Sequence, residues 1–189
     1  KPDIIGFTGD LLDVNKEYVQ DCFDALKLLS APLKLAVSGN HEFYHGYEHY
    51  RSDIKELGFT LMDNKSLRHS DILFLGFPDK TSNRIGDLER DIYSLYQDKK
   101  ESDFIVVLDH QPSDFESHVQ KGAHLQLSGH THGGQIVPFN LLVRLSFRYP
   151  KGLRRFKDAY IYTSIGSSTW GPPMRLWTPS EIAVFDLTY

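Results

Sequence analysis

The chain has 189 residues, 40% of them hydrophobic, which is enough to bury one substantial core and favours a single domain. Its net charge of −4, from 21 basic and 25 acidic residues, argues against a protein that holds nucleic acid through overall charge. The single cysteine, Cys22, excludes a disulfide framework and a thiolate zinc cluster, and no apolar run approaches the ~18 residues of a membrane-spanning helix.

Strands and helices are predicted to alternate through the first third of the chain. Apolar runs at 3–7 and 33–37 predict buried strands, and polar residues follow each of them. Apolar residues at helical spacing predict a helix that starts near Asn15 and ends before Pro32, and a second one that runs from Tyr47 to a cap at Gly58.

The remainder of the chain is richer in strands. Helical spacing from Ile85 to Leu95 predicts an amphipathic helix, and Ser113 with Glu116 has the form of a capping box that starts a helix ending near Lys121. Residues 139–158 show no clear period. The predicted strands lie at 60–62, 72–77, 104–108, 124–128, 160–163 and 182–187. A polar turn joins the first of these strands to the second. This order predicts an α/β layered fold with a mixed sheet or a second sheet.

Four predicted strands end in residue types that bind metal ions. These residues are Asp10 and Asp13, Asn40 and His41, His110, and finally His130 and His132. A His-x-His turn alone could equally be two surface histidines, but sites in α/β sheets form at the carboxyl ends of strands, where all four ends can meet. Oxygen and imidazole ligands suit manganese, zinc or iron, and one bridging carboxylate can hold two ions ~3.5–4 Å apart.

The motifs at these strand ends resemble a known superfamily. Gly9-Asp10-Leu11-Leu12-Asp13, Gly39-Asn40-His41-Glu42, a strand-end His110 and Gly129-His130-Thr131-His132 are similar, in this order, to four of the five motifs of the calcineurin-like metallophosphoesterases. The resemblance implies a β-sandwich of two mixed sheets flanked by helices. The first motif of the superfamily, Asp-x-His, is absent, so we expect a single domain over 1–189 that lacks its first strand and helix at the N-terminus.

A narrower resemblance concerns the second half of the chain. Gly133-Gly134-Gln135 and the segments 166–175 and 179–182 are similar to the branch of membrane-anchored bacterial phosphoesterases. It implies an anchor upstream of Lys1 and a membrane-associated protein.

The resemblance also implies a role for each motif residue. Asp10 would bridge two divalent ions, with Asn40, His110 and His130 on one ion and His132 on the other, and the second site would be incomplete without the missing motif. His41 would protonate the leaving oxygen or stabilise its charge, with Asp13 orienting its ring. Glu42 is expected to have a supporting role. Arg175 is a candidate for holding a phosphate oxygen, with an ordinary exposed arginine as the alternative.

These expectations favour a metal-dependent phosphoesterase that hydrolyses a phosphodiester or a pyrophosphate through a metal-activated hydroxide. One alternative is a binding or scaffold module with the same fold and no turnover, although the intact His41 favours an enzyme. A protein phosphatase is disfavoured because Val14-Asn15 follows Asp13, where that branch has Arg-Gly. A nucleic-acid partner is not expected.

Residues 139–158 are unusual in charge. They carry six basic residues against Asp158 alone, which gives +5, so the rest of the chain carries −9. Interleaved Leu and Phe side chains suit this segment to an anionic membrane surface, with a lipid-linked substrate. The alternative is a cationic rim that attracts soluble phosphorylated substrates.

Overall fold

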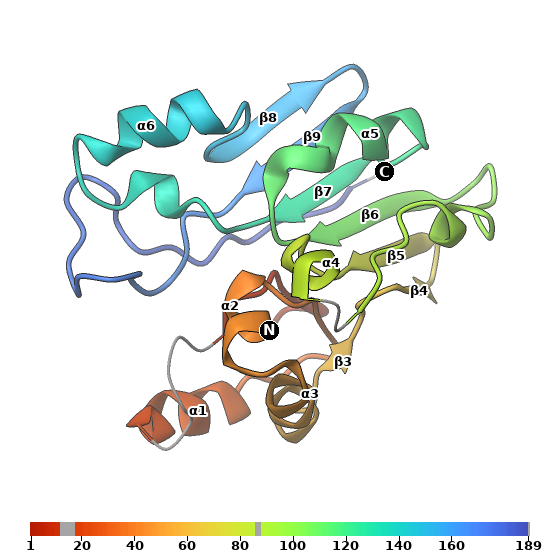
Figure 1. Ribbon diagram of the computed structural model, residues 1–189. Helices are drawn as coiled ribbons and strands as arrows, with labels where there is room; N and C mark the ends of the chain where they lie inside the picture. Colours follow the sequence, from red (N-terminus) through yellow and green to blue (C-terminus); the bar gives the residue numbers. More distant parts are fainter. Residues whose placement is uncertain (12–17, 86–87, 189) are drawn as a thin grey trace.

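The computed structural model describes residues 1–11, 18–85 and 88–188, and it contains two sheets that face each other, with helices on their outer sides (Figure 1). The smaller sheet has three parallel strands in the order β1-β2-β3. Its strands are β1 (Ile4–Phe7), β2 (Leu33–Ala36) and β3 (Thr60–Leu61). The helices of this half are α1 (Gln20–Lys27), α2 (Asn40–His45) and α3 (Tyr47–Glu56).

The larger sheet has six strands in the order β4-β5-β6-β7-β9-β8. The pairs β4 with β5 and β8 with β9 are antiparallel, and the inner pairs are parallel. The strands are β4 (Lys65–His69), β5 (Ile72–Phe77), β6 (Phe104–Asp109), β7 (Leu125–Ser128), β8 (Gly152–Phe156) and β9 (Ala159–Thr163). The helical segments between them are α4 (Thr81–Ile85), η2 (Ser94–Tyr96), η3 (Pro112–Asp114), α5 (Phe115–Gln120), η4 (His132–Gly134) and α6 (Phe139–Ser146).

Apolar side chains between the two sheets form the central core. Leu35 and Met62 from the smaller sheet's side pack with Phe74, Val106 and Leu108 of the larger sheet. The outer face of the smaller sheet is covered by α1 and α3 through a second cluster that includes Phe23 and Ile54. The predicted α/β fold of two sheets flanked by helices is therefore confirmed, but the described strands of the smaller sheet are parallel, where a mixed sheet was expected.

The predicted helix over 85–95 is wrong. Among the residues described there, only Ile85 at the end of α4 and the short η2 are helical, and residues 88–93 have no regular structure. The side chain of Arg90 is buried in ion pairs with Asp109 and Asp114, which draws the backbone out of a helical path. The capping box is also wrong, because α5 starts at Phe115 without a side-chain cap and Glu116 accepts a hydrogen bond from the Tyr149 hydroxyl instead.

Other differences concern strands and the basic segment. The apolar alternation at 182–187 is present, but no described strand pairs with it, so no ladder forms. The segment 139–158, which shows no clear period, contains α6 and β8, and β8 forms a hairpin with β9 directly after it. The predicted polar turn contains β4, an edge strand whose polar side chains concealed it. Within the described ranges, no helix has both the length and the apolar character needed to cross a lipid bilayer.

Gly76 of β5 offers a test of how closely the two sheets approach. A Cβ atom at this position would lie 2.2 Å from Cβ of Met62 and 2.5 Å from its carbonyl oxygen. We expect Gly76→Ala to lower the free energy of unfolding by ~1–3 kcal/mol, the usual cost of overpacking a core. Urea unfolding provides the measurement. Gly6→Ala on β1 is the matched control, because its Cβ would lie at an ordinary 3.7 Å from Leu108, and equal losses in the two variants would contradict this packing.

Candidate metal centre

Residues that follow the carboxyl ends of four strands, two from each sheet, meet at one end of the two facing sheets. Oδ2 of Asp10, after β1, lies 3.0 Å from Nε2 of His110, after β6. Nδ1 of His130, after β7, lies 3.2 Å from the same His110 nitrogen and 2.9 Å from Oδ1 of Asn40, after β2. Asp10, His110 and His130 each offer one ligand atom, and these atoms all lie within 4.8 Å of one another. The structure therefore brings together four of the five residues that the sequence predicted as metal ligands.

Two glycines make this convergence possible. A Cβ atom on Gly39 would lie 2.1 Å from Oδ1 of Asp10, and one on Gly9 would lie 2.7 Å from Nδ1 of His110. Gly9 also has φ +92°, a conformation that other residues rarely adopt. The glycines that precede Asp10 and Asn40 in their motifs are thus required by the close approach of neighbouring loops.

The backbone at two of these residues is in the left-handed region, with φ of 56° at Asp10 and 71° at His130. Such conformations cost on the order of 1–3 kcal/mol for a residue with a side chain, and they persist where the surroundings fix them. They turn both side chains sharply away from their strands towards the shared centre.

The carboxylate of Glu42 fixes the backbone around Asp10. Its oxygens accept hydrogen bonds from the amides of Gly39 at 2.6 Å, Asp10 at 3.0 Å and Leu11 at 2.6 Å. The loops after β1 and β2 are thereby joined through one buried side chain. The sequence predicted a supporting role for Glu42, and these hydrogen bonds show that it supports the backbone on either side of Asp10 and at Gly39.

The tautomer of His110 suits a metal ligand. Its Nδ1 lies 2.6 Å from the carbonyl oxygen of Thr8, which can only accept, so Nδ1 carries the hydrogen and Nε2 is directed at the centre. A backbone carbonyl that orients a histidine in this way is common around protein-bound metals. Together with the oxygen atoms of Asp10 and Asn40, the donor set fits a divalent ion such as manganese, zinc or iron. The contact with Thr8 uses only its backbone, so no sequence pattern could have indicated it.

The charges at the centre are strongly coupled. Burial alone would raise the pKa of Asp10, but the charge and hydrogen bond of His110 outweigh it and hold this pKa well below its usual range. Burial would lower the pKa of His110, but Asp10 raises it to about 9. Burial and the charge of His110 lower the pKa of His130 to about 4. Burial and the nearby Asp10 raise the pKa of Glu42 to about 7.

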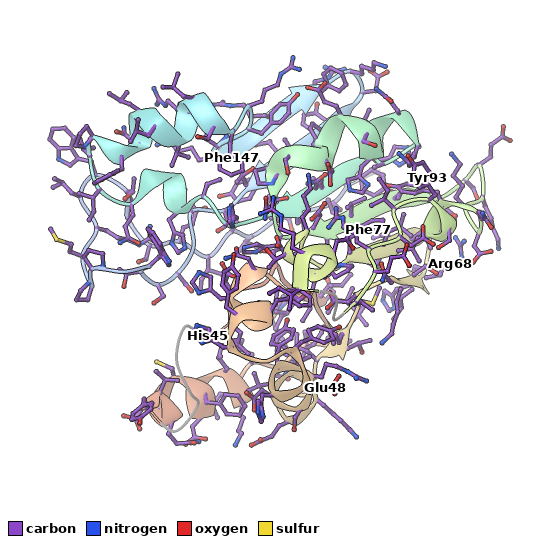
Figure 2. All side chains as sticks on the ribbon, in the orientation of Figure 1. His45, Glu48, Arg68, Phe77, Tyr93 and Phe147 are labelled. Carbon is purple, nitrogen blue, oxygen red and sulfur yellow. The ribbon has the colours of Figure 1, made fainter. Side chains whose placement is uncertain are left out.

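His41 is the second residue of α2 and directly follows Asn40. Its backbone amide donates to Oδ1 of Asp10 at 3.1 Å, and its ring makes an edge contact with Tyr44 at 5.9 Å between centroids. Figure 2 shows His45 at the far end of the same short helix. Asp13, the residue predicted to orient the His41 ring, lies outside the described residues.

His132 and Arg175 face each other at the border of the centre. Nη2 of Arg175 lies 3.3 Å from Nδ1 of His132, and His132 is not part of the group formed by Asp10, His110 and His130. The guanidinium of Arg175 also donates to the carbonyl oxygen of Ile165 at 2.7 Å and to that of Ser168. Arg175 thus holds the loop after β9, and its role with a substrate remains a prediction.

A hollow of about 340 Å³ lies beside the centre and was not anticipated from the sequence. Phe147 joins the two, because its ring makes an edge contact with His130 at 5.5 Å and it also lines the hollow. Figure 2 places Phe147 between α6 and α5. The remaining lining residues are Pro112, Ser113, Glu116, Ser146, Arg148 and Tyr149.

Comparison with known proteins agrees with this geometry. The profile of the family described as calcineurin-like phosphoesterase matches residues 1–134, which include all four strand ends. The chain belongs to the calcineurin-like phosphoesterase family. Membership implies divalent metal ions, and the residues around His110 fit them.

The similar proteins are metallophosphoesterases from diverse organisms. An uncharacterized metallophosphoesterase of Helicobacter pylori is 37% identical over 190 residues, which cover 98% of this chain and 51% of the relative. One of Aquifex aeolicus is 32% identical over 196 residues, which cover 97% and 72%. A transmembrane protein with metallophosphoesterase domain of Bos taurus is 28% identical over 203 residues, which cover 96% and 45%. The chain thus spans about half the length of the Helicobacter relative.

The raised pKa of His110 predicts that metal affinity depends on pH. Nε2 must be deprotonated to bind an ion, and the pKa of about 9 means that a proton competes with the ion at lower pH. We expect the apparent affinity for Mn²⁺ to rise by up to about tenfold per pH unit between roughly pH 7 and pH 9, because one proton is released. Competition against a chelator of known pH dependence measures this. His69→Gln on β4 is the control that should keep the slope, and a flat profile in the unsubstituted protein would contradict the coupling.

Proposed function

We propose that this chain is the catalytic part of a metal-dependent phosphoesterase that hydrolyses a phosphodiester or a pyrophosphate. The observation that carries the proposal is the convergence of Asp10, Asn40, His110 and His130 from four separate strand ends. Family membership supports the same reading. The alternative, a binding or scaffold module of the same fold without turnover, would keep these residues but hydrolyse nothing.

Asp10, Asn40, His110 and His130 would hold one divalent ion, and His132 is the proposed ligand of a second. When bound, such ions polarise phosphoryl oxygens and make water a better nucleophile near neutral pH. The chain itself orients these ligands. The Thr8 carbonyl fixes the His110 ring, the His41 amide fixes the Asp10 carboxylate, and Glu42 fixes the backbone amide of Asp10. A centre with its ligands fixed before substrate arrives has less reorganisation to undergo in the transition state.

His41 is the proposed proton donor to the leaving oxygen. Its backbone is tied to Asp10, and the charge of its ring is close enough to contribute to the lowered pKa of Asp10. The proposal places this ring beside the leaving group of a bound phosphate ester, as the role of proton donor requires. A positioned acid or base of this kind contributes roughly 10²–10⁴-fold to a rate.

Substitution of His41 separates this role from metal binding. In the full-length protein we expect His41→Ala to lower turnover of an aryl phosphodiester by roughly 10²–10⁴-fold while the metal content stays nearly unchanged. His130→Ala is the comparison variant, which should lose metal as well as activity. Unchanged turnover in His41→Ala would rule out the proton-donor role. No turnover in the metal-loaded unsubstituted protein, on a panel of phosphodiesters and pyrophosphates, would favour the binding module.

The proposed substrate is lipid-linked, and the support for this comes from the surface of α6. Four apolar side chains of this helix are exposed, and none of its residues is buried. We call them the α6 patch: Phe139, Leu141, Leu142 and Leu145. In Figure 1, α6 lies at the β8 and β9 end of the larger sheet, away from α1 and α3.

Basic residues accompany the α6 patch. The segment 139–158 has a net charge of six minus one, or +5, whereas the whole chain has −4. Lys and Arg side chains near an anionic bilayer contribute ~1 kcal/mol each, while apolar side chains enter the boundary of the acyl chains. Phe147 of the same segment contacts His130. One lipid-linked substrate could therefore place its phosphate at the metal centre and its acyl chains at the α6 patch. Relatives described as transmembrane proteins fit a site at a membrane.

Vesicle co-sedimentation tests the membrane proposal. We expect binding to anionic phosphatidylglycerol vesicles, and a several-fold smaller bound fraction for Leu142→Ser with Leu145→Ser, because buried apolar area is lost while the charge is kept. Leu28→Ser is the matched control, since Leu28, directly after α1, is 83% exposed and Leu145 is 85% exposed. Binding that disappears with salt but ignores the serine substitutions would favour a cationic rim for soluble substrates.

A further inference from the structure

A second group of metal-binding residue types lies behind the candidate metal centre. Asp109, Asp114 and His118 each offer a ligand atom, and these atoms lie within 4.8 Å of one another. A cation already occupies their midst, because Nη2 of Arg90 lies 2.5 Å from Oδ2 of Asp109 and 2.9 Å from Oδ2 of Asp114. Nη1 of Arg90 adds a bond of 3.1 Å to Oδ1 of Asp109. The guanidinium therefore takes the place that an ion would need, and this group is an ion-pair cluster.

The centre of the cluster, formed by Arg90, Asp109 and His118, is buried. The side chains of Arg90 and Asp109 are 4% and 0% exposed. His118 lies 3.2 Å from Oδ2 of Asp109 through Nε2, and its Nδ1 lies 2.8 Å from the hydroxyl of Tyr96. The ring of Phe77, labelled in Figure 2, lies against both the His118 ring, at 4.7 Å, and the Arg90 guanidinium, at 5.4 Å. Charges buried this deeply persist only when their partners are held in place.

The position of Asp109 connects this cluster to the metal centre. Asp109 is the last residue of β6, and the next residue is His110. Its backbone carbonyl accepts a hydrogen bond of 2.6 Å from Ser128 Oγ, while its carboxylate is gripped by Arg90 and His118. With side chain and carbonyl both fixed, the direction in which the chain enters His110 is fixed as well.

Arg90 reaches this position from an irregular segment between β5 and β6. Its guanidinium also donates to the carbonyl oxygen of Pro78, and its backbone amide donates to Oδ1 of Asn83 at 2.8 Å. The segment is thus anchored at both its backbone and its side chain. These contacts hold an irregular segment in the position from which Arg90 pairs with Asp109.

We propose that Arg90 is a positioning residue for the metal centre: its two-pronged grip on Asp109 keeps Nε2 of His110 directed at Asp10 and His130. The inference rests on the proposed metal centre and adds to it a residue that contacts none of the ligands. A planar guanidinium can hold a carboxylate by two parallel bonds, whereas a lysine ammonium supplies charge without that geometry. Partners that orient a metal ligand typically contribute 10–100-fold to metal affinity.

The test compares Arg90→Lys with Arg68→Lys. Arg68 on edge strand β4 pairs with Asp103 at the far side of the same sheet and has no connection to His110, so it controls for the loss of a guanidinium ion pair. Mn²⁺ affinity is measured by chelator competition on the full-length protein, under conditions where urea unfolding shows each variant to be folded. We expect Arg90→Lys to bind Mn²⁺ about 10–100-fold more weakly and Arg68→Lys to bind it as the unsubstituted protein does.

Asp114→Ala provides a second variant should Arg90→Lys not fold. It removes one of the two carboxylates that hold Arg90 at a position that is 22% exposed, and a smaller weakening of Mn²⁺ affinity, of a few-fold, is expected. Unchanged affinity in folded Arg90→Lys, or in Asp114→Ala where Arg90→Lys does not fold, overturns the positioning role alone. Equal weakening in Arg68→Lys does the same. Absence of Mn²⁺ binding by the unsubstituted protein overturns the metal centre and, with it, this inference.

Discussion

The bonds from Glu42 to three backbone amides are the constraint on which the rest of the centre depends. These amides belong to the loops after β1 and β2, and Glu42 lies 32 residues from Asp10 and 31 residues from Leu11 in the sequence. Buried N–H groups need acceptors, and a single carboxylate supplies one for all three. Because Asp10 has a left-handed backbone, its side chain would not stay directed at His110 without this fixed frame.

Two ionic systems lie on either side of His110 and have different tasks. On one side, Asp109 is neutralised by Arg90, so its charge is satisfied within the protein. On the other side, Asp10 interacts with His110, whose pKa it raises to about 9. Because Arg90 neutralises Asp109, Asp10 is the carboxylate next to His110 that remains to bind an external cation. The structural charge of Asp109 is thus kept apart from the charge of Asp10 at the proposed metal centre.

The site was easier to predict from the sequence than the segments around it. Asp10, Asn40, His110 and His130 follow apolar strand runs, and the geometry of parallel strands brings such positions together. The glycines of their motifs were also visible, and the structure supplies the physical reason in close contacts of Gly9 and Gly39.

The secondary structure of three segments was predicted wrongly or not at all, because it depends on the surroundings of each segment and not on its local sequence pattern alone. Residues 88–93 have the spacing of a helix but follow the buried ion pair of Arg90. Residues 139–158 combine the eight-residue helix α6 with strand β8, so no single period runs through them. The apolar alternation at 182–187 suits a strand, but a strand requires a neighbour with which to pair.

The origin of the four converging residues has a consequence for folding as well as for chemistry. Asp10 and Asn40 follow strands β1 and β2 of the smaller sheet, and His110 and His130 follow strands β6 and β7 of the larger one. An ion held by both pairs would act as a clasp between the two halves of the sandwich. Because it binds the folded chain, the free energy of unfolding would grow by ~2.7 kcal/mol when the free ion is at 100 times its dissociation constant. The supply of metal in the surroundings would then set the fraction of the protein that is folded as well as the proposed activity.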